Sequence, residues 1–261
     1  HGELKDCLFL DGLEDAYDKG KLMGEFAEIC ATEYQFTRAE QDAFATESLK
    51  RAQKACAEKI FANELIPVVV KTRQGEIIVD MDEHPGSVDI GKIPTLKSAF
   101  SLNGTITAAN ASSIADGAAA VVLIRESEAK KYGVKSLARI VAHATFAKKP
   151  AEFTTAPIDA IKKLLQKSQW KMEDVDLFEI NEAFAVVAMA AMRDLNIPHA
   201  KLNIHGGGCA LGHPIGATGA RLVVTLIAAL RQKNSKRGIA ALCIGGGEAI
   251  AIAVEMESHH A

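Results

Sequence analysis

From about residue 114 onward, short apolar runs of strand length alternate with segments of helical spacing. The apolar runs predict strands at 118–124, 139–143, 175–180, 202–204, 239–244 and 249–255. The segments between them predict helices at 127–132, 158–169, 182–195 and 217–232. Strands that alternate with helices are typical of a layered α/β domain. Glycines join the last two strands, so we expect those two to form an antiparallel pair.

The chain up to about residue 113 has a different character and mixes charged helices with irregular loops. Thr37 and Glu40 have the spacing of a capping box, which predicts a helix that continues to about Glu58. The residue pattern further predicts two short strands and then a loop, at 68–70, 76–79 and 82–94.

Length and composition limit the class of protein. The 261 residues suit one large domain or two smaller ones, and we divide them into a loop domain at 1–113 and a C-terminal α/β domain at 114–257. A net charge of -3 argues against a nucleic-acid surface or an anionic-membrane binder. The longest apolar stretch, 222–230, is too short to span a bilayer.

Five cysteines at wide spacings, with no CxxC, argue against a disulfide framework and favour a reducing compartment. We therefore expect a cytoplasmic location. The sequence opens with His1 and not Met, so it looks like a piece of something longer, and a mitochondrial origin stays open.

Three short segments near the C-terminal end each place a reactive side chain beside small residues. They carry Asn181 in 181–184, His213 in 206–214 and Cys243 in 243–247. Small residues let a substrate approach the backbone closely. A Cys and a His without metal-ligand spacing point to acyl or carbanion chemistry, so we predict no metal site.

Each of these residues also has a purely structural interpretation. Asn181 is a favoured helix N-cap, His213 stands near a helix start, and Cys243 resembles a small buried hydrophobe. In the functional interpretation, the amide of Asn181 holds a substrate oxygen or an ordered water. The imidazole of His213 donates toward an oxyanion or takes a thiol proton, and the thiol of Cys243 shuttles protons.

Taken together, the segments Asn-Glu-Ala-Phe, Gly-His-Pro and Cys-Ile-Gly-Gly-Gly resemble the thiolase family and stand in that family's order. The segment 107–119 resembles it as well, and the resemblance extends from about Leu10 to Glu255. It is greatest to the acetoacetyl-CoA-forming branch, the acetyl-CoA acetyltransferases. The resemblance implies a thiolase-like α/β fold, in which two similar α/β halves pack together.

The resemblance also implies a mechanism. A nucleophilic Cys takes an acetyl group from acetyl-CoA, and a second Cys removes a proton from another acetyl-CoA, so that a Claisen condensation gives acetoacetyl-CoA; thiolysis is the reverse. His213 matches the His that activates the nucleophile and lines an oxyanion hole, and Cys243 matches the second Cys. Asn181 matches the residue that positions the water of that hole, and Gly245 matches a backbone N–H of the other hole. No cofactor is implied, because the CoA thioesters are substrates.

The resemblance implies further contacts with the CoA thioester. Met23 lies where the family often has His-Met-Gly, and Ala183 and Phe184 match the channel floor. Positions that line the pantetheine channel are matched by Phe100, Ala108, Ser112 and Ile114. A tunnel of small and apolar residues suits a thin amphipathic arm.

Two departures from the family shape the expectations. No Cys lies in the Cys-Gly-Ser-Gly-like context of the family's nucleophile, so we expect the N-terminal domain that carries it to be missing and the chain to be inactive without it. In addition, Gly86-Ser87 stands where short-chain members usually carry an Arg, so either that CoA contact is missing or a few residues are absent there.

Three functions therefore stay open: an acetyl-CoA acetyltransferase, a 3-ketoacyl-CoA thiolase of broader chain length, and a non-catalytic CoA-binding or assembly half that needs a partner chain. We expect a homo-oligomer, either a dimer or a tetramer, or else a complex with a chain that carries the N-terminal half. Nucleic acid and membrane are not expected as partners.

Overall fold

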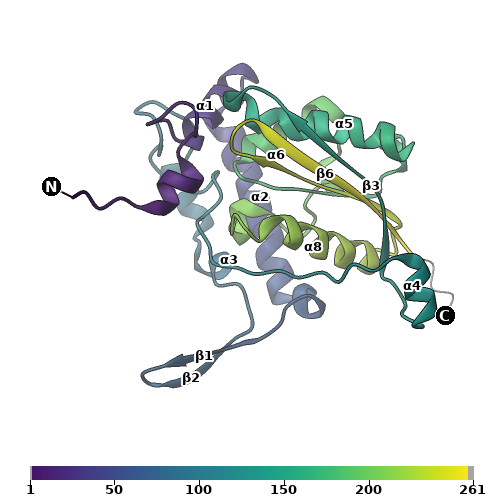
Figure 1. Cartoon of the computed structure of the whole chain (residues 1–261). Helices are drawn as coiled ribbons and strands as arrows, with labels where there is room; N and C mark the ends of the chain where they lie inside the picture. Colours follow the sequence, from purple (N-terminus) through teal and green to yellow (C-terminus); the bar gives the residue numbers. More distant parts are fainter. Residues whose placement is uncertain (1, 258–261) are drawn as a thin grey trace.

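The computed structural model describes residues 2–257, and a four-stranded sheet lies at its centre (Figure 1). The strand order is β3-β6-β5-β4, where β3 is Ala138–Ala147, β6 is Glu248–Met256, β5 is Arg237–Ile244 and β4 is Leu177–Ile180. β6 runs antiparallel to both of its neighbours, whereas β4 and β5 are parallel. The predicted antiparallel pairing of the last two strands is therefore confirmed.

Helices cover both faces of this sheet (Figure 1). α5 (Ala156–Ser168) and α6 (Ala185–Leu195) share one apolar core with Ile239 and Ala241 of β5. α8 (Thr218–Gln232) packs on the other face, in a second core that contains Ala240 of β5. Successive side chains of a strand point to opposite faces, so β5 is buried on both sides, as expected in a layered α/β fold.

Two longer helices of the N-terminal part, α1 (Met23–Glu33) and α2 (Arg38–Ala57), pack against this α/β body. The predicted capping box at the start of α2 is confirmed. The backbone N–H of Glu40 donates to the Thr37 hydroxyl at 3.2 Å, and the backbone N–H of Thr37 donates to the Glu40 carboxylate at 2.7 Å.

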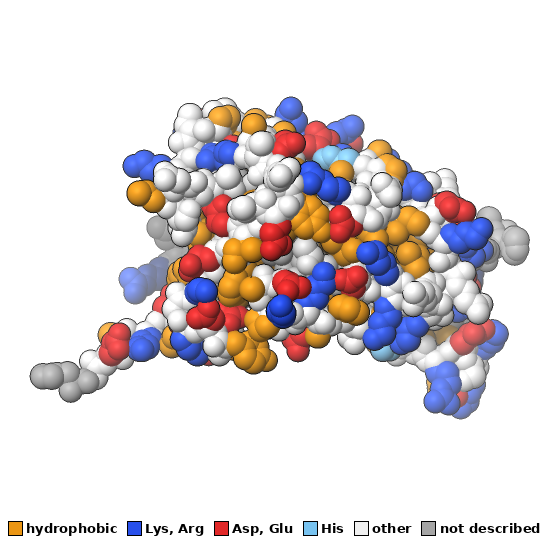
Figure 2. Space-filling model, turned by 90° about the horizontal axis from the view of Figure 1, so that it is seen from above, with side chains coloured by type: hydrophobic (Ala, Val, Ile, Leu, Met, Phe, Trp, Pro, Cys, Tyr) orange, Lys and Arg blue, Asp and Glu red, His pale blue; other side chains and the backbone are white. Residues whose placement is uncertain are grey.

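The predicted hairpin is also present and projects away from the body (Figure 1). It pairs β1 (Val68–Thr72) with β2 (Gly75–Val79), and all ten residues are exposed. Figure 2 shows another face of the molecule, where Lys and Arg side chains intermingle with Asp and Glu and hydrophobic side chains lie between them.

Several shorter elements complete the fold. The predicted loop at 82–94 instead contains the short helix α3 (His84–Ser87) and the 3-10 turn Ile90–Thr95. The helix predicted at 127–132 is α4 (Glu126–Lys131), and Gly133 follows it at φ +65°. The fold also contains the short helix α7 (Gly208–Leu211), a π-helical turn at Phe9–Leu13, and short 3-10 helices at Ile60–Asn63, Pro150–Thr155, Met172–Asp174 and His199–Lys201.

Two predicted strands are wrong. Residues 118–124 form no strand, because no other described strand pairs with them; Val122 is 95% exposed. The strand predicted at 202–204 reduces to one bridge between Leu202 and Phe178. The side chain of Asn203 takes the place of a strand there: its Oδ1 accepts from the backbone N–H of Ile180, and its Nδ2 donates to the Ile180 carbonyl.

A contact between the buried side chain of Glu179 and the guanidinium of Arg221 links β4 to α8. The Glu179 side chain is 1% exposed, and its Oε2 lies 3.7 Å from Nη1 of Arg221. Burial raises the pKa of Glu179 to about 8, although the charge of Arg221 acts in the opposite direction. The guanidinium therefore offsets only part of the cost of taking this carboxylate out of water.

This pair predicts a pH dependence of stability. The folded protein holds a proton on Glu179 between pH 4.5 and about 8, whereas the unfolded chain releases it. Within that window the contribution of Glu179 to the free energy of unfolding falls as the pH rises, by up to ~1.4 kcal/mol per pH unit. Glu179→Gln removes this slope, so the variant gains stability relative to the unaltered protein between pH 5 and pH 8. Urea unfolding at both pH values measures the difference.

The matched control is Glu173→Gln, since the Glu173 side chain is exposed. That variant should follow the unaltered protein at both pH values. If Glu179→Gln differed in stability from the unaltered protein by the same amount at pH 5 and pH 8, Glu179 would not have a raised pKa in the folded protein.

Candidate active site

The carboxylate of Glu182 joins three segments that are distant in the sequence. It is buried, and its Oε2 accepts hydrogen bonds from the Ser48 hydroxyl of α2 at 2.7 Å and from the backbone N–H of Cys209 at 3.1 Å. Its Oε1 accepts from Nδ2 of Asn203 at 2.8 Å. Burial raises the pKa of Glu182, while these hydrogen bonds lower it. The segment 181–184 is thereby tied to α2 and to the glycine loop, residues 206–214.

A second loop, residues 110–113, lies against the same segment. The backbone N–H of Ser112 donates to the Ala183 carbonyl at 2.9 Å, and that of Ala185 donates to the Asn110 carbonyl at 2.7 Å. The backbone N–H of His213 in turn donates to the Ser113 carbonyl at 3.0 Å. The loops that carry Asn181, Ser112 and His213 therefore form one connected cluster.

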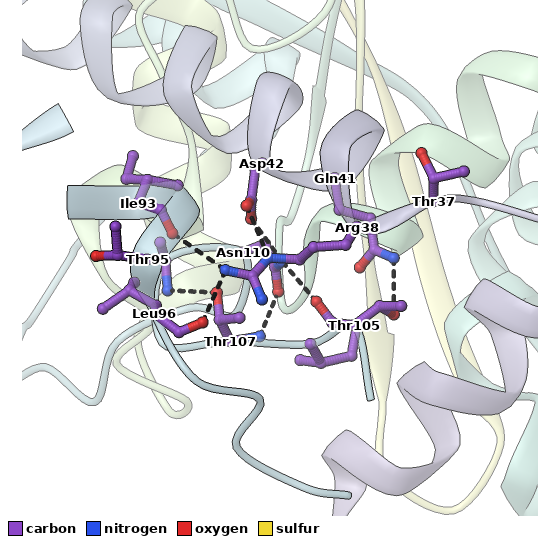
Figure 3. A network of polar contacts seen from close by, with 12 residues as sticks. Thr37, Arg38, Gln41, Asp42, Ile93, Thr95, Leu96, Thr105, Thr107 and Asn110 are labelled. Atoms are coloured by element: carbon purple, nitrogen blue, oxygen red, sulfur yellow. Dashed lines mark hydrogen bonds and ion pairs between the residues drawn. The ribbon is translucent and has the colours of Figure 1, made fainter. Parts of the chain in front are cut away.

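The polar network of Figure 3 anchors loop 110–113 to α2. Nδ2 of Asn110 donates to the Asp42 carboxylate at 3.1 Å, and Asp42 also pairs with Arg38 at 2.7 Å. Oδ1 of Asn110 accepts from the backbone N–H of Thr107 at 2.7 Å. Since these groups are buried or half-buried and bonded to one another, the loop has a fixed position.

Asn181 is fully buried, and neither polar atom of its side-chain amide has a hydrogen-bond partner among the described residues. α6 begins at Ala185 with Phe184 as its N-cap, so the N-cap interpretation of Asn181 is wrong. A Cβ at Gly208 would lie 3.2 Å from Oδ1 of Asn181, so glycine leaves room beside the amide. A buried unpaired amide is costly, and this one is therefore suited to bind a ligand or a water.

His213 lines a cavity of about 560 Å³ together with Ser112, Ile114 and Asp116. Its Nδ1 lies 2.6 Å from the hydroxyl oxygen of Thr218. Burial, and after it the positive charge of Arg221, lowers the pKa of His213 to about 4. The imidazole is therefore neutral at pH 7 and can accept a proton.

Cys243 lies on β5, in the core shared with α5 and α6, and is 6% exposed. Burial raises the pKa of its thiol to about 12. The backbone N–H of Asn181 donates to the carbonyl of Ala241, two residues before Cys243, so both residues lie at the carboxyl edge of the parallel pair β4–β5. Cys243 is not among the residues that line the cavity of His213.

Gly245 follows Cys243 in the turn between β5 and β6. A Cβ at this position would lie 3.5 Å from Sδ of Met23, so α1 begins next to the turn. Gly246 and Gly247 have φ values of +95° and +97°, which favour glycine.

The structure divides the residues matched to CoA contacts into two groups. Met23, Phe100, Ala183 and Phe184 gather around the apolar core; the rings of Phe100 and Phe184 are 6.0 Å apart in a T-shaped arrangement. Ser112 and Ile114 instead line the cavity of His213. Ala108 is exposed and does not line that cavity.

Sequence reasoning missed Glu182, Asn203 and Thr218 as residues that shape the site. A signal existed for Glu182, since it is an acidic residue beside apolar Ala183 and Phe184. The roles of Asn203 and Thr218 depend on contacts that no sequence pattern specifies.

Residues 2–257 contain no cluster of three or more His, Cys, Asp or Glu side chains suited to bind a metal ion. Within the same range, none of the helices has both the length and the apolar character needed to cross a membrane.

Comparisons with known proteins identify relatives of the whole chain. Residues 1–127 match the family model "Thiolase, N-terminal domain", and residues 134–256 match "Thiolase, C-terminal domain". The chain is 49% identical to the "Probable acetyl-CoA acetyltransferase" of Dictyostelium discoideum, over 96% of this chain and 60% of that protein.

Two solved structures share the fold. The acetyl-CoA acetyltransferase of Bacillus anthracis has a TM-score of 0.95 at 41% identity, covering 98% of this chain and 65% of that one. Human mitochondrial 3-ketoacyl-CoA thiolase has a TM-score of 0.89 at 32% identity, covering 98% of this chain and 64% of that one. The chain thus spans less than two thirds of the length of these relatives.

These matches correct one expectation and confirm another. Residues 1–127 match the family's N-terminal domain, so the prediction that this domain is missing is wrong, and the predicted inactivity loses its basis. The prediction rested on the context of a single cysteine and not on the whole segment.

The division at 113/114 stays a prediction, whereas the structural matches confirm the thiolase-like α/β fold. Since both domain models match and the relatives align over 96% or more of its length, the chain belongs to the thiolase family.

Proposed function

We propose that the protein is an acetyl-CoA acetyltransferase, which condenses two acetyl-CoA molecules to acetoacetyl-CoA and CoA and catalyses the reverse thiolysis. The observation that carries this proposal is the buried, unpaired amide of Asn181 in a loop cluster that also holds a neutral His213. The name of the Dictyostelium relative, at 49% identity, supports the same substrate class.

His213 and Cys243 have complementary protonation states. Burial and the charge of Arg221 keep the imidazole neutral, so it can take the proton of a thiol and later return it. Burial keeps the thiol of Cys243 protonated, with a pKa of about 12. During thiolysis the acyl-carrying thiolate adds to the 3-keto carbonyl of acetoacetyl-CoA and keeps the acetyl group. The carbon–carbon bond breaks, and the enolate that leaves takes the Cys243 proton, so that Cys243 becomes a thiolate. Condensation is the reverse: Cys243, now a thiolate, takes a proton from the methyl group of acetyl-CoA, and the resulting enolate forms the new carbon–carbon bond with the acetyl group held on the acyl-carrying thiol.

Asn181 and Gly245 complete the assignment by stabilising negative charge. The unpaired amide of Asn181 holds a water that donates to the thioester oxygen, next to Nε2 of His213. The backbone N–H of Gly245 donates to the oxygen of the second thioester. Fixed donors of this kind stabilise charge that develops in the transition state.

In this proposal the CoA thioester contacts both groups of residues that match the family's CoA contacts: those in the cavity of His213 and those around the apolar core. Its pantetheine arm passes Ser112 and Ile114 in the cavity and reaches Ala183 and Phe184, while Met23, Phe100 and Ala108 border its path. The acyl-carrying thiol is assigned to no residue of this sequence, because none of the five cysteines lies in a Cys-Gly-Ser-Gly-like context. Because the chain spans less than two thirds of its relatives, the activity is proposed for the full-length protein. A dimer or tetramer and a cytoplasmic location stay predictions.

Removal of either proton-transfer group should strongly reduce activity. In full-length protein, His213→Ala and Cys243→Ala should each lower kcat of acetoacetyl-CoA thiolysis by ~10²–10⁴-fold, because a positioned acid or base typically contributes that much. Matched controls are His143→Ala and Cys56→Ala, since His143 is exposed on β3 and Cys56 is half-buried on α2. Near-normal turnover after either of the first two substitutions would refute the assigned roles.

Asn181→Leu separates function from stability. The unpaired amide destabilises the fold by ~1–3 kcal/mol, so an apolar side chain of similar size should leave the free energy of unfolding unchanged or raise it. The same variant should lower kcat by ~10²–10³-fold, since one donor to the oxyanion is lost. Urea unfolding and steady-state thiolysis measure the two effects. Unchanged kcat would show that the amide serves no transition-state role.

The alternative, a 3-ketoacyl-CoA thiolase of broader chain length, has the support of the human structure at 32% identity. Comparing kcat/KM for acetoacetyl-CoA with that for 3-ketoacyl-CoA of eight or more carbons separates the two. A preference for the longer substrate would favour this alternative.

A further inference from the structure

Thr218 makes two side-chain contacts that together determine where a proton lies. It is fully buried at the first position of α8. Its hydroxyl oxygen lies 2.9 Å from the carbonyl oxygen of Pro214 and 2.6 Å from Nδ1 of His213. One hydroxyl group therefore stands between a carbonyl and an imidazole nitrogen.

A threonine hydroxyl has a single proton to donate, and the Pro214 carbonyl has none. If that proton pointed to His213, two oxygens with lone pairs would face each other at 2.9 Å with no proton between them. The Pro214 carbonyl does accept the backbone N–H groups of Ala217 and Thr218, but those bonds do not remove this repulsion. The hydroxyl therefore donates to Pro214, and its free lone pair accepts from His213.

Only the protonated Nδ1 of His213 can donate to that lone pair. The imidazole is neutral, because burial and the charge of Arg221 lower its pKa to about 4, so the other nitrogen carries no proton. No described residue forms a hydrogen bond with Nε2, and it is not among the atoms sealed from solvent without a partner. His213 lines the 560 Å³ cavity, so ligands in that cavity can reach this nitrogen.

We propose that Thr218 fixes His213 as the tautomer with its proton on Nδ1, which leaves Nε2 as the nitrogen that exchanges protons in the cavity. Thr218 is thus a positioning residue that acts through His213. Its catalytic meaning rests on the proposed function: a thiol proton can move to Nε2 only if that nitrogen is bare. The tautomer itself can be measured without any turnover.

Nitrogen NMR of the full-length protein, labelled with ¹⁵N-histidine, tests the proposal directly at pH 7.5. The His213 signals are assigned by their loss in His213→Ala. We expect the unaltered protein to show the protonated nitrogen at Nδ1 and the bare nitrogen at Nε2. Thr218→Ser keeps the hydroxyl and should keep this pattern, whereas Thr218→Val should shift population toward the other tautomer. A proton on Nε2 in the unaltered protein would overturn the proposal, whether or not the variants fold.

Kinetics supply a second readout. Thr218→Val should lower kcat of thiolysis by ~10²-fold or more, with KM little changed, and Thr218→Ser should restore most of it. Equal loss in both variants, with the tautomer unchanged in Thr218→Val, would contradict the role of the hydroxyl. If the unaltered protein shows no thiolysis at all, the proposed function fails, and the NMR result alone decides this inference.

Discussion

The buried carboxylate of Glu182 is the interaction on which the geometry of the site depends. It bonds Ser48 of α2, Asn203 of the loop between α6 and α7, and the backbone of Cys209 in α7. A buried carboxylate is costly unless its lone pairs are satisfied, so the three segments can meet here only in an arrangement that supplies these donors. The glycines of the loop follow from the same constraint: a Cβ at Gly207 would overlap the Glu182 carboxyl group, and one at Gly208 would lie 2.8 Å from the Glu182 carbonyl oxygen.

This arrangement leaves reactive groups in two different environments. His213 borders a cavity and is neutral because burial disfavours its charged form, whereas Cys243 lies in the apolar core and is neutral for the same reason. One group is therefore ready to accept a proton and the other to donate one. Two titratable groups whose environments displace their pKa values in opposite directions are typical of an acid/base pair.

Short-range sequence signals predicted the helices and strands that interactions between neighbouring residues determine. The capping box of Thr37 and Glu40 specifies its own helix start, and the glycine turn of the last two strands specifies their antiparallel pairing. Local signals could not show whether residues 118–124 form a strand. A strand needs a neighbouring strand to pair with, and an apolar run does not specify one. Asn203 replaces a strand by bonding both backbone groups of Ile180, and the contact between Thr218 and His213 depends on how α8 begins. Motif order predicted the residues of the candidate site, but only the structure separates the cavity of His213 from the core around Cys243.

The central claim is that the loops held by Glu182 place Asn181 and His213 around one thioester oxygen. A crystal structure of the full-length protein with bound acetoacetyl-CoA measures this directly. The account predicts a water bonded to the amide of Asn181 and within hydrogen-bond distance of the thioester oxygen, with Nε2 of His213 facing the same oxygen, to which it can donate once it has taken the thiol proton. A thioester bound elsewhere, with the Asn181 amide still unpaired, would contradict it.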